Sequence, residues 1–301
     1  MSVLTDILKR TVSDLKIAKA RRPLSELQKM AKDAPPVRSL KKALRAARFS
    51  IIGEIKERSP SAGEMSSESV QKALAVYNQS RAISAVSILT DAPYFGGSLE
   101  RLWQARRRLA KPILRKDFII DEYQLWEARA FGADAVLLMA SVHADSRQKL
   151  HDLYHAASGL GLQCLMEIGM SHIPAEEQAA MVPPEAPIWG INSRKFDSTR
   201  FQVNHQLGNV FGSGVRSIGP DYSVNPDRHS EMRQLIPAGK IAVAESGITD
   251  PSELQNLVDH DYDAALIGTA FLRPPGKIAQ IVGEFAEAIK SLDRTASRAH
   301  A

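Results

Sequence analysis

The stretch ILRKDFIIDEYQLWEARAFGADAVLL, residues 113–138, contains the pattern that decides the fold of this chain. It opens on a short apolar run that ends in a lysine, Ile113–Lys116, and closes on a second apolar run that begins at Ala135. Between them, residues 122–131 have the spacing of an amphipathic helix. Both runs are almost continuously apolar, which is typical of parallel strands whose faces are covered by helices. The stretch therefore predicts one strand–helix–strand unit.

The same unit recurs along most of the chain. Eight apolar runs appear, at Ser50–Lys56, Ala85–Thr90, Ile113–Lys116, Ala135–Ala140, Leu162–Ile168, Ile188–Asn192, Ile241–Glu245 and Ala264–Gly268. Amphipathic stretches follow them near residues 66–81, 98–110, 122–131, 145–160, 171–182, 227–236, 250–259 and 275–292. Eight such units over about 240 residues predict an α/β fold of the (βα)8 TIM barrel type. A doubly wound sheet is the alternative, and the number of units favours the barrel.

Two segments lie outside the repeating pattern. Before the first run, three short stretches have helical spacing, at residues 3–19, 23–32 and 37–48. We therefore expect a helical extension over residues 1–48 and a barrel domain over residues 49–301. Within the barrel, residues near 205–226 are rich in Gly, Ser, Asn and Pro and form an insertion that a minimal unit does not need. A lengthened surface loop is favoured there over a segment for association.

Local signals place two helix starts more closely. Ser98 directly precedes an amphipathic stretch, and a serine in that position is a good N-cap. Asp250 is followed by Pro251, which places a capping side chain beside a proline at the first helical turn. We expect helices to begin at these two points.

The charge of the chain is concentrated in its N-terminal extension. The 301 residues carry 39 Lys and Arg against 34 Asp and Glu, a net charge of +5. Residues 1–48 hold 13 basic and 4 acidic side chains, so the remainder holds 26 basic and 30 acidic ones. The barrel is thus slightly acidic, and a basic surface for nucleic acid is not indicated. We expect no nucleic-acid partner.

Composition excludes several other classes of protein. A single cysteine, Cys164, rules out an internal disulfide and fits a reducing compartment. No apolar run approaches the ~18 residues of a membrane-spanning helix. The N-terminus lacks the apolar core and small-residue cleavage site of a secretory signal. We therefore expect a cytoplasmic protein with no membrane partner.

Polar side chains gather where the predicted strands end. In a TIM barrel those ends face the active site, and charged residues are rarely directed toward an interior without a partner or a function. Six of the eight runs end in this way, with Glu54 and Lys56, Lys116, Glu167, Asn192 and Arg194, Glu245, Ser246 and Gly247, and Gly268 and Thr269. A solvated strand end explains any one of them, but it does not explain the set.

The last two units carry a signal for phosphate. In many barrels the loops after the seventh and eighth strands bind phosphate through backbone N–H groups. The small residues of Ser246–Ile248 and Gly268–Ala270 permit such a close approach. Their occurrence on neighbouring strands favours a small phosphorylated ligand.

Several motifs together resemble one family. EIKERSPSAG (54–63), SILTDAPYFGGS (87–98), the stretch 113–138, LMEI (165–168), GINSR (190–194), AESGI (244–248) and LIGTAFLR (266–273) are similar to indole-3-glycerol phosphate synthases, over roughly residues 3–292. The resemblance implies a carboxy-lyase of tryptophan biosynthesis that acts on 1-(o-carboxyphenylamino)-1-deoxyribulose 5-phosphate. An aromatic carbon attacks the sugar carbonyl, CO2 leaves, and water leaves last. The resemblance implies no metal and no organic cofactor. A monomer or a homodimer is expected.

The resemblance also implies a role for each motif residue. Lys116 would be the general acid, Glu167 the general base and Lys56 the cation that holds the substrate carboxylate, with Glu54 and Asn192 orienting lysines and hydroxyls. Ser59, Gly247, Gly268 and Thr269 would bind phosphate, with Thr269 where a serine is usual. Phe95, Phe118 and Leu138 would pack on the anthranilate ring, and Arg194, Glu245 and Ser246 would complete the polar wall.

The charges of this set have a physical consequence. Three carboxylates, on Glu54, Glu167 and Glu245, share one cavity with the ammonium groups of Lys56 and Lys116. Carboxylates that lie close together disfavour each other's ionised form. We therefore expect coupled titration, with the pKa of at least one glutamate raised by its neighbours.

Alternative functions are weaker. Phosphoribosylanthranilate isomerase is another phosphate-binding barrel, but it is expected to use a Cys/Asp pair, and Cys164 is out of phase with the carboxylate of its own run. An inactive barrel that serves as a binding module through its basic N-terminus would not need the set of strand-end residues. His151 and His155 lie four apart on a predicted helix, a spacing that can bind metal, but no third ligand accompanies them.

Overall fold

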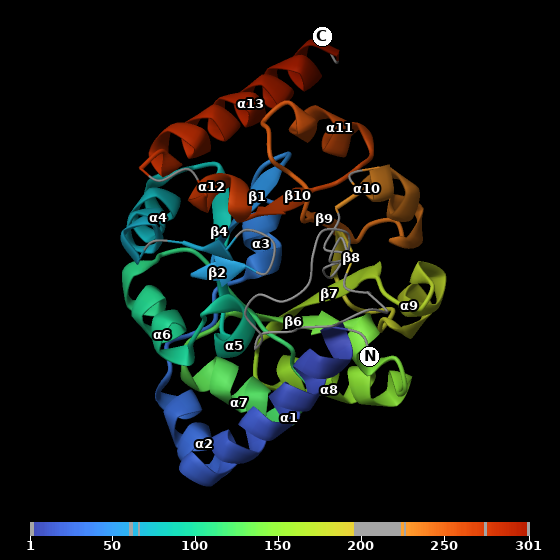
Figure 1. The fold of residues 1–301 in the computed structure, drawn as a ribbon. Coiled ribbons are helices and arrows are strands. Elements are labelled where there is room, and N and C mark those ends of the chain that lie inside the picture. The colour runs from blue at the N-terminus through green and yellow to red at the C-terminus, as the bar shows by residue number, and fades with distance from the viewer. Residues whose placement is uncertain are drawn as a thin grey trace, which may run out of the picture.

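The computed structural model describes residues 3–59, 63–65, 67–195, 224–225, 227–273 and 276–299. Within them, parallel strands close into a barrel, in which β1 pairs with β4 on one side and β10 on the other (Figure 1). The barrel strands are β1 (Ser50–Ile55), β4 (Ile83–Leu89), β5 (Ile113–Lys116), β6 (Ala135–Met139), β7 (Gln163–Met170), β8 (Ile188–Lys195), β9 (Ile241–Glu245) and β10 (Ala264–Ile267). The predicted TIM barrel is confirmed.

Helices alternate with the strands and surround the barrel (Figure 1). The outer helices are α4 (Ser67–Gln79), α6 (Leu99–Arg108), α7 (Glu122–Ala130), α8 (Arg147–Gly159), α9 (Ala175–Met181), α10 (Asp227–Met232), α11 (Glu253–Asp259) and α13 (Ile278–Ala299). Ser98 caps α6 by accepting a hydrogen bond from Arg101 N–H, as predicted. Asp250 also acts as a cap, because its Oδ1 accepts from the backbone N–H of Ser252, but the turn over residues 250–252 separates it from α11, which begins three residues later than predicted.

Alternation along the strands divides the core into two parts. Ile52, Leu114 and Leu165 point inward and belong to the cluster that fills the barrel. Their neighbours Ile51 and Cys164 belong to the cluster between the strands and the outer helices. Because side chains two apart share a strand face, Glu54, Lys116 and Glu167 also face the barrel interior. The strand phases assumed for these three residues are confirmed.

Three helices precede the first strand, namely α1 (Val3–Arg21), α2 (Leu24–Asp33) and α3 (Leu40–Leu44). Leu4 and Ile7 of α1 are buried in the barrel-filling cluster. Tyr123 of α7 donates to two carbonyl groups near the end of α1, on Ala18 and Arg22. In Figure 1, α1 runs along the lower edge of the barrel past α7 and α8, and α3 lies behind the strands. α3 is shorter than the helix predicted at residues 37–48, because residues 35–39 have no regular structure and residues 45–49 form a turn and bends.

A buried ionic network holds the segment between α2 and α3 to the barrel. Asp134, which has no exposed surface, accepts from Arg38 N–H and Nε and from Arg106. It also accepts from the backbone N–H of Ile113 at the start of β5. Asp134 precedes β6, so this network lies at the end of the barrel opposite the carboxyl ends of the strands. The carboxylate of Asp134 therefore accepts four hydrogen bonds in total.

Several short elements were not predicted. They are the hairpin of β2 (Arg58–Ser59) and β3 (Gly63–Glu64), the helices α5 (Ala92–Phe95) and α12 (Thr269–Leu272), and the 3-10 helices η1 (Ala140–His143) and η2 (Arg233–Leu235). Most follow the carboxyl end of a strand, where they shape the rim of the barrel. The insertion near 205–226 lies almost wholly outside the described residues. No helix among the described residues is long and apolar enough to cross a membrane.

Candidate active site

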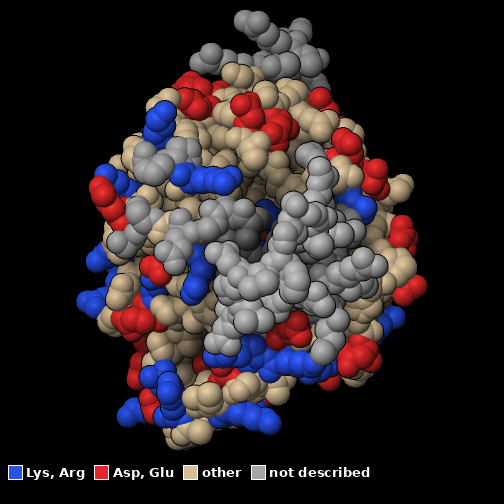
Figure 2. Space-filling model, in the orientation of Figure 1, with Lys and Arg blue, Asp and Glu red and all other residues tan. Residues whose placement is uncertain are grey.

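A cavity of about 400 Å³ opens at the carboxyl ends of the strands. Figure 2 shows the same face of the molecule, with a hollow near its centre. Of the residues singled out in the sequence, the lining contains Glu54, Lys56, Phe95, Lys116, Phe118, Glu167, Asn192, Arg194, Glu245, Ser246, Gly247, Gly268 and Thr269. These residues lie on seven of the barrel strands or on the segments that follow them. Residues more than 200 positions apart in the chain thus line one cavity.

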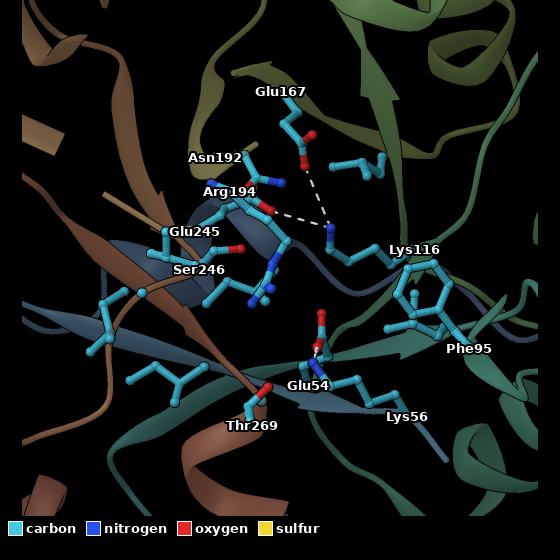
Figure 3. Close-up of a pocket in the computed structure, with 18 of the residues that line it drawn as sticks. Glu54, Lys56, Phe95, Lys116, Glu167, Asn192, Arg194, Glu245, Ser246 and Thr269 are labelled. Carbon is cyan, nitrogen blue, oxygen red and sulfur yellow. Dashed lines mark hydrogen bonds and ion pairs between the residues drawn. The ribbon is translucent and has the colours of Figure 1, made fainter. Parts of the chain in front are cut away.

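The ammonium group of Lys116 lies between two carboxylates. Its Nζ is 3.4 Å from Glu167 Oε2 and 3.5 Å from Glu245 Oε2 (Figure 3). Although burial opposes the charge, Glu167, Glu245 and Glu54 raise the pKa of Lys116 above its ordinary range. Lys116 is therefore protonated throughout the neutral range and directs a positive charge into the cavity.

A second ion pair lies on β1. Lys56 Nζ donates to Glu54 Oε1 at 2.6 Å, and both side chains are more than nine-tenths buried. Burial alone would raise the pKa of Glu54, but Lys56 and Lys116 together hold the pKa below its ordinary value. Glu54 is therefore the ionised partner that holds Lys56 in place.

Glu245 has a different environment, although it is only 1% exposed. Among the described residues, neither of its carboxylate oxygens has a hydrogen-bond partner. Burial and the nearby charge of Glu167 raise the pKa of Glu245 well above its ordinary value, against the opposing effect of Lys116. The expectation that at least one glutamate of the cluster has a raised pKa is confirmed in direction.

The backbone is unusual after β9 and tightly packed after β10. Ser246 and Gly247 both have positive φ, 65° and 80°. That conformation is uncommon for a residue with a side chain, and strain of this kind concentrates at functional sites. A Cβ added to Gly268 would lie 2.5 Å from Glu54 Oε1, so any larger residue there would force the Glu54 side chain to move. Thr269 follows as the first residue of α12.

One wall of the cavity is aromatic and apolar. The rings of Phe95 and Phe118 lie 6.5 Å apart at 30°. The apolar residues contributed by β6 are Leu137 and Met139, whereas Leu138 is fully buried in the cluster beneath the outer helices. The assignment of Leu138 to the ring-binding wall was therefore wrong. The phase of β6 follows from its pairing with β5, which sets Ala135 against Leu114, and a single sequence does not show that register.

Other assignments have different outcomes. The side chain of Ser59 lies outside the described residues, so its predicted role in phosphate binding stays a prediction. Arg273 and Thr249 line the cavity and were not singled out. Their positions beyond the ends of β9 and β10 were a usable signal, since those loops were already expected to face the ligand.

The weaker signals of the sequence lie away from the cavity. His151 Nε2 lies 3.0 Å from the carbonyl oxygen of Met181, and His155 faces Glu185 at 3.5 Å. The described residues contain no group of three or more His, Cys, Asp or Glu side chains arranged to hold a metal ion. Cys164 is buried in the core beneath the outer helices.

Comparisons with known proteins show which family the chain resembles in sequence. A family model described as indole-3-glycerol phosphate synthase matches residues 4–209. A protein of that name from Bacteroides thetaiotaomicron is 33% identical over 273 residues, which cover 91% of this chain and 94% of the relative. Another, from Lachnospira eligens, is 38% identical and covers 79% of this chain and 80% of its own.

A solved structure shows the fold alone. The 3-hexulose-6-phosphate synthase of Salmonella typhimurium superimposes with a TM-score of 0.54 at 11% identity. The match covers 80% of this chain and 99% of that one. At this identity the likeness establishes a shared barrel and carries no information on the reaction.

Proposed function

Because the chain belongs to the indole-3-glycerol phosphate synthase family, an enzyme family of tryptophan biosynthesis, we propose that the cavity at the barrel mouth closes the indole ring with Lys116 as acid and Glu167 as base. The observation that carries this assignment is the 3.4 Å separation of Lys116 Nζ and Glu167 Oε2. A proton donor and a proton acceptor face each other in one enclosed cavity, so that each can act on the same substrate.

The first step is ring closure. The aromatic carbon that bears the carboxylate forms a bond to the carbonyl carbon of the sugar, and the carbonyl π electrons move to oxygen. Lys116 stabilises that developing charge and transfers a proton to the oxygen. Its raised pKa supports this role, since the group is fully protonated when the substrate arrives. Lys116 then takes up a proton from solvent, and the neighbouring carboxylates favour this because they stabilise its charged form.

Decarboxylation and dehydration complete the reaction. Loss of CO2 returns the electrons of its carbon–carbon bond to the ring, which becomes aromatic again. The new hydroxyl then leaves as water after it receives a proton from Lys116 or Lys56. Glu167 accepts the proton that is lost from the neighbouring carbon as the indole double bond forms. The burial of Glu167, which is 3% exposed, favours a carboxylate that accepts protons from substrate rather than from water.

Binding uses the two ends of the cavity. Lys56 would hold the substrate carboxylate, and Glu54 and Asn192 would orient the lysines and the sugar hydroxyls. Gly247, Gly268 and Thr269 would present backbone N–H groups to the phosphate, together with Ser59. Phe95 and Phe118 would contact the anthranilate ring, with Leu137 and Met139 in the place first given to Leu138. Arg194, Glu245 and Ser246 would complete the polar wall.

The proposal extends to the organisation of the protein. Residues 1–48 would form an extension that closes both ends of the barrel domain, residues 49–301. The active form would be a monomer in the cytoplasm, acting on a small phosphorylated substrate. This is supported by a cavity whose proposed acid and base both come from one chain.

Turnover of the substrate tests the function. Purified protein should convert 1-(o-carboxyphenylamino)-1-deoxyribulose 5-phosphate to a product with indole fluorescence. Lys116→Met removes the ammonium group and should abolish conversion, while Lys72→Met, on an exposed lysine of α4 that pairs with Glu68, should leave it unchanged. Full activity in Lys116→Met would remove the mechanism, and an inactive wild type would remove the function.

A further inference from the structure

The acid and the base both depend on loop backbone for their position. Lys116 is the last residue of β5, and residues 117–121 continue without regular structure. Glu167 lies near the end of β7, where the pairing with β8 changes register between Gly169 and Met170. A displacement of about 1 Å in a reacting group can cost on the order of 100-fold in rate. Contacts that fix these two backbone segments therefore bear directly on catalysis.

A buried glutamine of α7 fixes the segment after β5. Gln124 is 5% exposed. Its Nε2 donates to Phe118 O at 3.0 Å, and its Oε1 accepts from Ile120 N–H at 2.8 Å. One side-chain amide thus bonds to the backbone at both ends of residues 118–120, two residues beyond Lys116. The same contact holds Phe118, whose ring lines the cavity.

A second buried glutamine, on α9, does the same after β7. Gln178 has no exposed surface. Its Oε1 accepts from Gly169 N–H at 3.1 Å, and its Nε2 donates to Gly169 O at 2.7 Å. The Nε2 group also donates to Ser171 Oγ at 3.2 Å and to Ile173 O at 2.9 Å. Gly169 lies two residues after Glu167, so the amide ties down the chain that carries the base.

Only an amide meets the needs of both segments. Each segment presents a backbone N–H group and a carbonyl oxygen, so the clamping group must accept with one atom and donate with another. A glutamine side chain does both without a charge, whereas an ionised glutamate only accepts. Methionine fills a similar volume but forms neither hydrogen bond. Buried polar groups left without partners are costly, so the loss of either amide frees its loop to seek water.

We propose that Gln124 and Gln178 are positioning residues, which hold the backbone after β5 and β7 so that Lys116 and Glu167 keep their separation. Neither side chain lines the cavity, so each acts through the residue that its loop carries. The inference rests on the proposed roles of Lys116 and Glu167.

Three matched variants test the proposal, namely Gln124→Met, Gln178→Met and the control Gln163→Met. Gln163 lies at the start of β7, where its amide accepts from Lys41 N–H at 2.8 Å, so the control removes a similar contact far from the cavity. Steady-state kinetics and hydrogen exchange of the Ile120 and Gly169 amides are measured on each folded variant. Where a methionine variant does not fold, Gln→Glu at the same position serves, because it keeps the acceptor and loses the donor.

The expected results differ among the variants. Gln178→Met should lower kcat about 10- to 100-fold with little change in KM, because Glu167 acts in the chemical step. Gln124→Met should lower kcat and also raise KM, because Phe118 moves together with Lys116. Exchange should accelerate at Gly169 in the first variant and at Ile120 in the second. Gln163→Met should keep the kcat, KM and pH–rate profile of the wild type.

Two results would overturn the proposal. One is a kcat within about twofold of the wild type in both loop variants. The other is an equal loss of kcat in Gln163→Met, which would indicate general damage to the fold. If the wild type has no turnover, the proposed function fails, and hydrogen exchange alone tests the two glutamines. Faster exchange at Ile120 and Gly169 in the variants than in the wild type would then support their positioning role, and unchanged exchange would refute it.

Discussion

Replacing Glu245 by glutamine should stabilise the protein at neutral pH, whereas the same change at Glu54 should destabilise it. Both carboxylates are buried in one cavity, but their surroundings are opposite. Glu54 accepts a 2.6 Å hydrogen bond from Lys56. Glu245 has no hydrogen-bond donor among the described residues, and its nearest cation, Lys116, is 3.5 Å away and also faces Glu167. The pKa is accordingly lowered for Glu54 and raised for Glu245.

The sign and size of each effect follow from the direction of the pKa shift. A carboxyl with a raised pKa contributes its full stability below the ordinary value of 4.5 and loses it as the pH rises toward the raised pKa. At pH 7, about 2.5 units above that ordinary value, the raised pKa of Glu245 costs at most about 3.5 kcal/mol, at ~1.4 kcal/mol per unit. Glutamine carries no charge and removes that cost.

The sign is reversed for Glu54. A carboxyl with a lowered pKa contributes stability above its ordinary value of 4.5, and that stability is lost as the pH falls through the lowered pKa. Glu54→Gln also leaves Lys56 buried without its partner. Removing one member of a buried ion pair typically costs about 3–5 kcal/mol. The variant should therefore be clearly less stable than the wild type at pH 7 and above.

Urea unfolding at two pH values measures both effects. At about pH 7, Glu245→Gln should raise the unfolding midpoint by up to about 1 M, given an m-value near 3 kcal/mol/M for a chain of this size. The gain should shrink near pH 5, where Glu245 is protonated in the unfolded chain for part of the time. A loss of stability in Glu245→Gln, or a gain that does not change with pH, would refute the reasoning. A Glu54→Gln protein with the same unfolding midpoint as the wild type would also refute it.

Two further substitutions test the packing at either end of the barrel. In Gly190→Ala the new Cβ would lie 2.1 Å from Glu245 Oε1, so the carboxylate must move; kcat should fall and stability should drop by about 1–3 kcal/mol, measured by kinetics and urea unfolding. Asp134→Asn should cost about 3–5 kcal/mol, because Arg38 and Arg106 keep their charges without a carboxylate. Its kcat on folded protein should equal that of the wild type, and a tenfold loss there would contradict the separation of the two ends.

Strand phase explains how much of the site could be predicted from the sequence. In β5, Lys116 is two residues from Leu114, and an apolar residue in that phase indicates an inward-facing side chain. The same argument placed Glu54 and Glu167 correctly, because a charged residue near the end of an otherwise apolar strand marks the face that points into the cavity. Local information of this kind is present in any single sequence.

The errors and omissions depend on contacts between distant segments. All five residues of β6 are apolar and buried, so the sequence does not show whether Leu137 or Leu138 faces inward. Only the register against β5 decides it. Gln124 and Gln178 lie in helices whose apolar residues have ordinary amphipathic spacing. Their hydrogen-bond partners lie in neighbouring loops, and the sequence does not show where those loops pass. A glutamine on a predicted helix is usually a solvated residue, and no local signal separates these two from the others.

Asp134 and Glu245 show which property distinguishes a structural carboxylate from a functional one. Both are almost completely buried, and both face cations. Asp134 accepts four hydrogen bonds, so its charge stabilises the fold at the closed end of the barrel. Glu245 accepts none among the described residues and stands beside Ser246, whose φ is positive, so this end of the molecule retains unfavourable contacts. A cavity that must receive a charged substrate has to leave such groups unsatisfied, and the satisfied network at the opposite end offsets that cost.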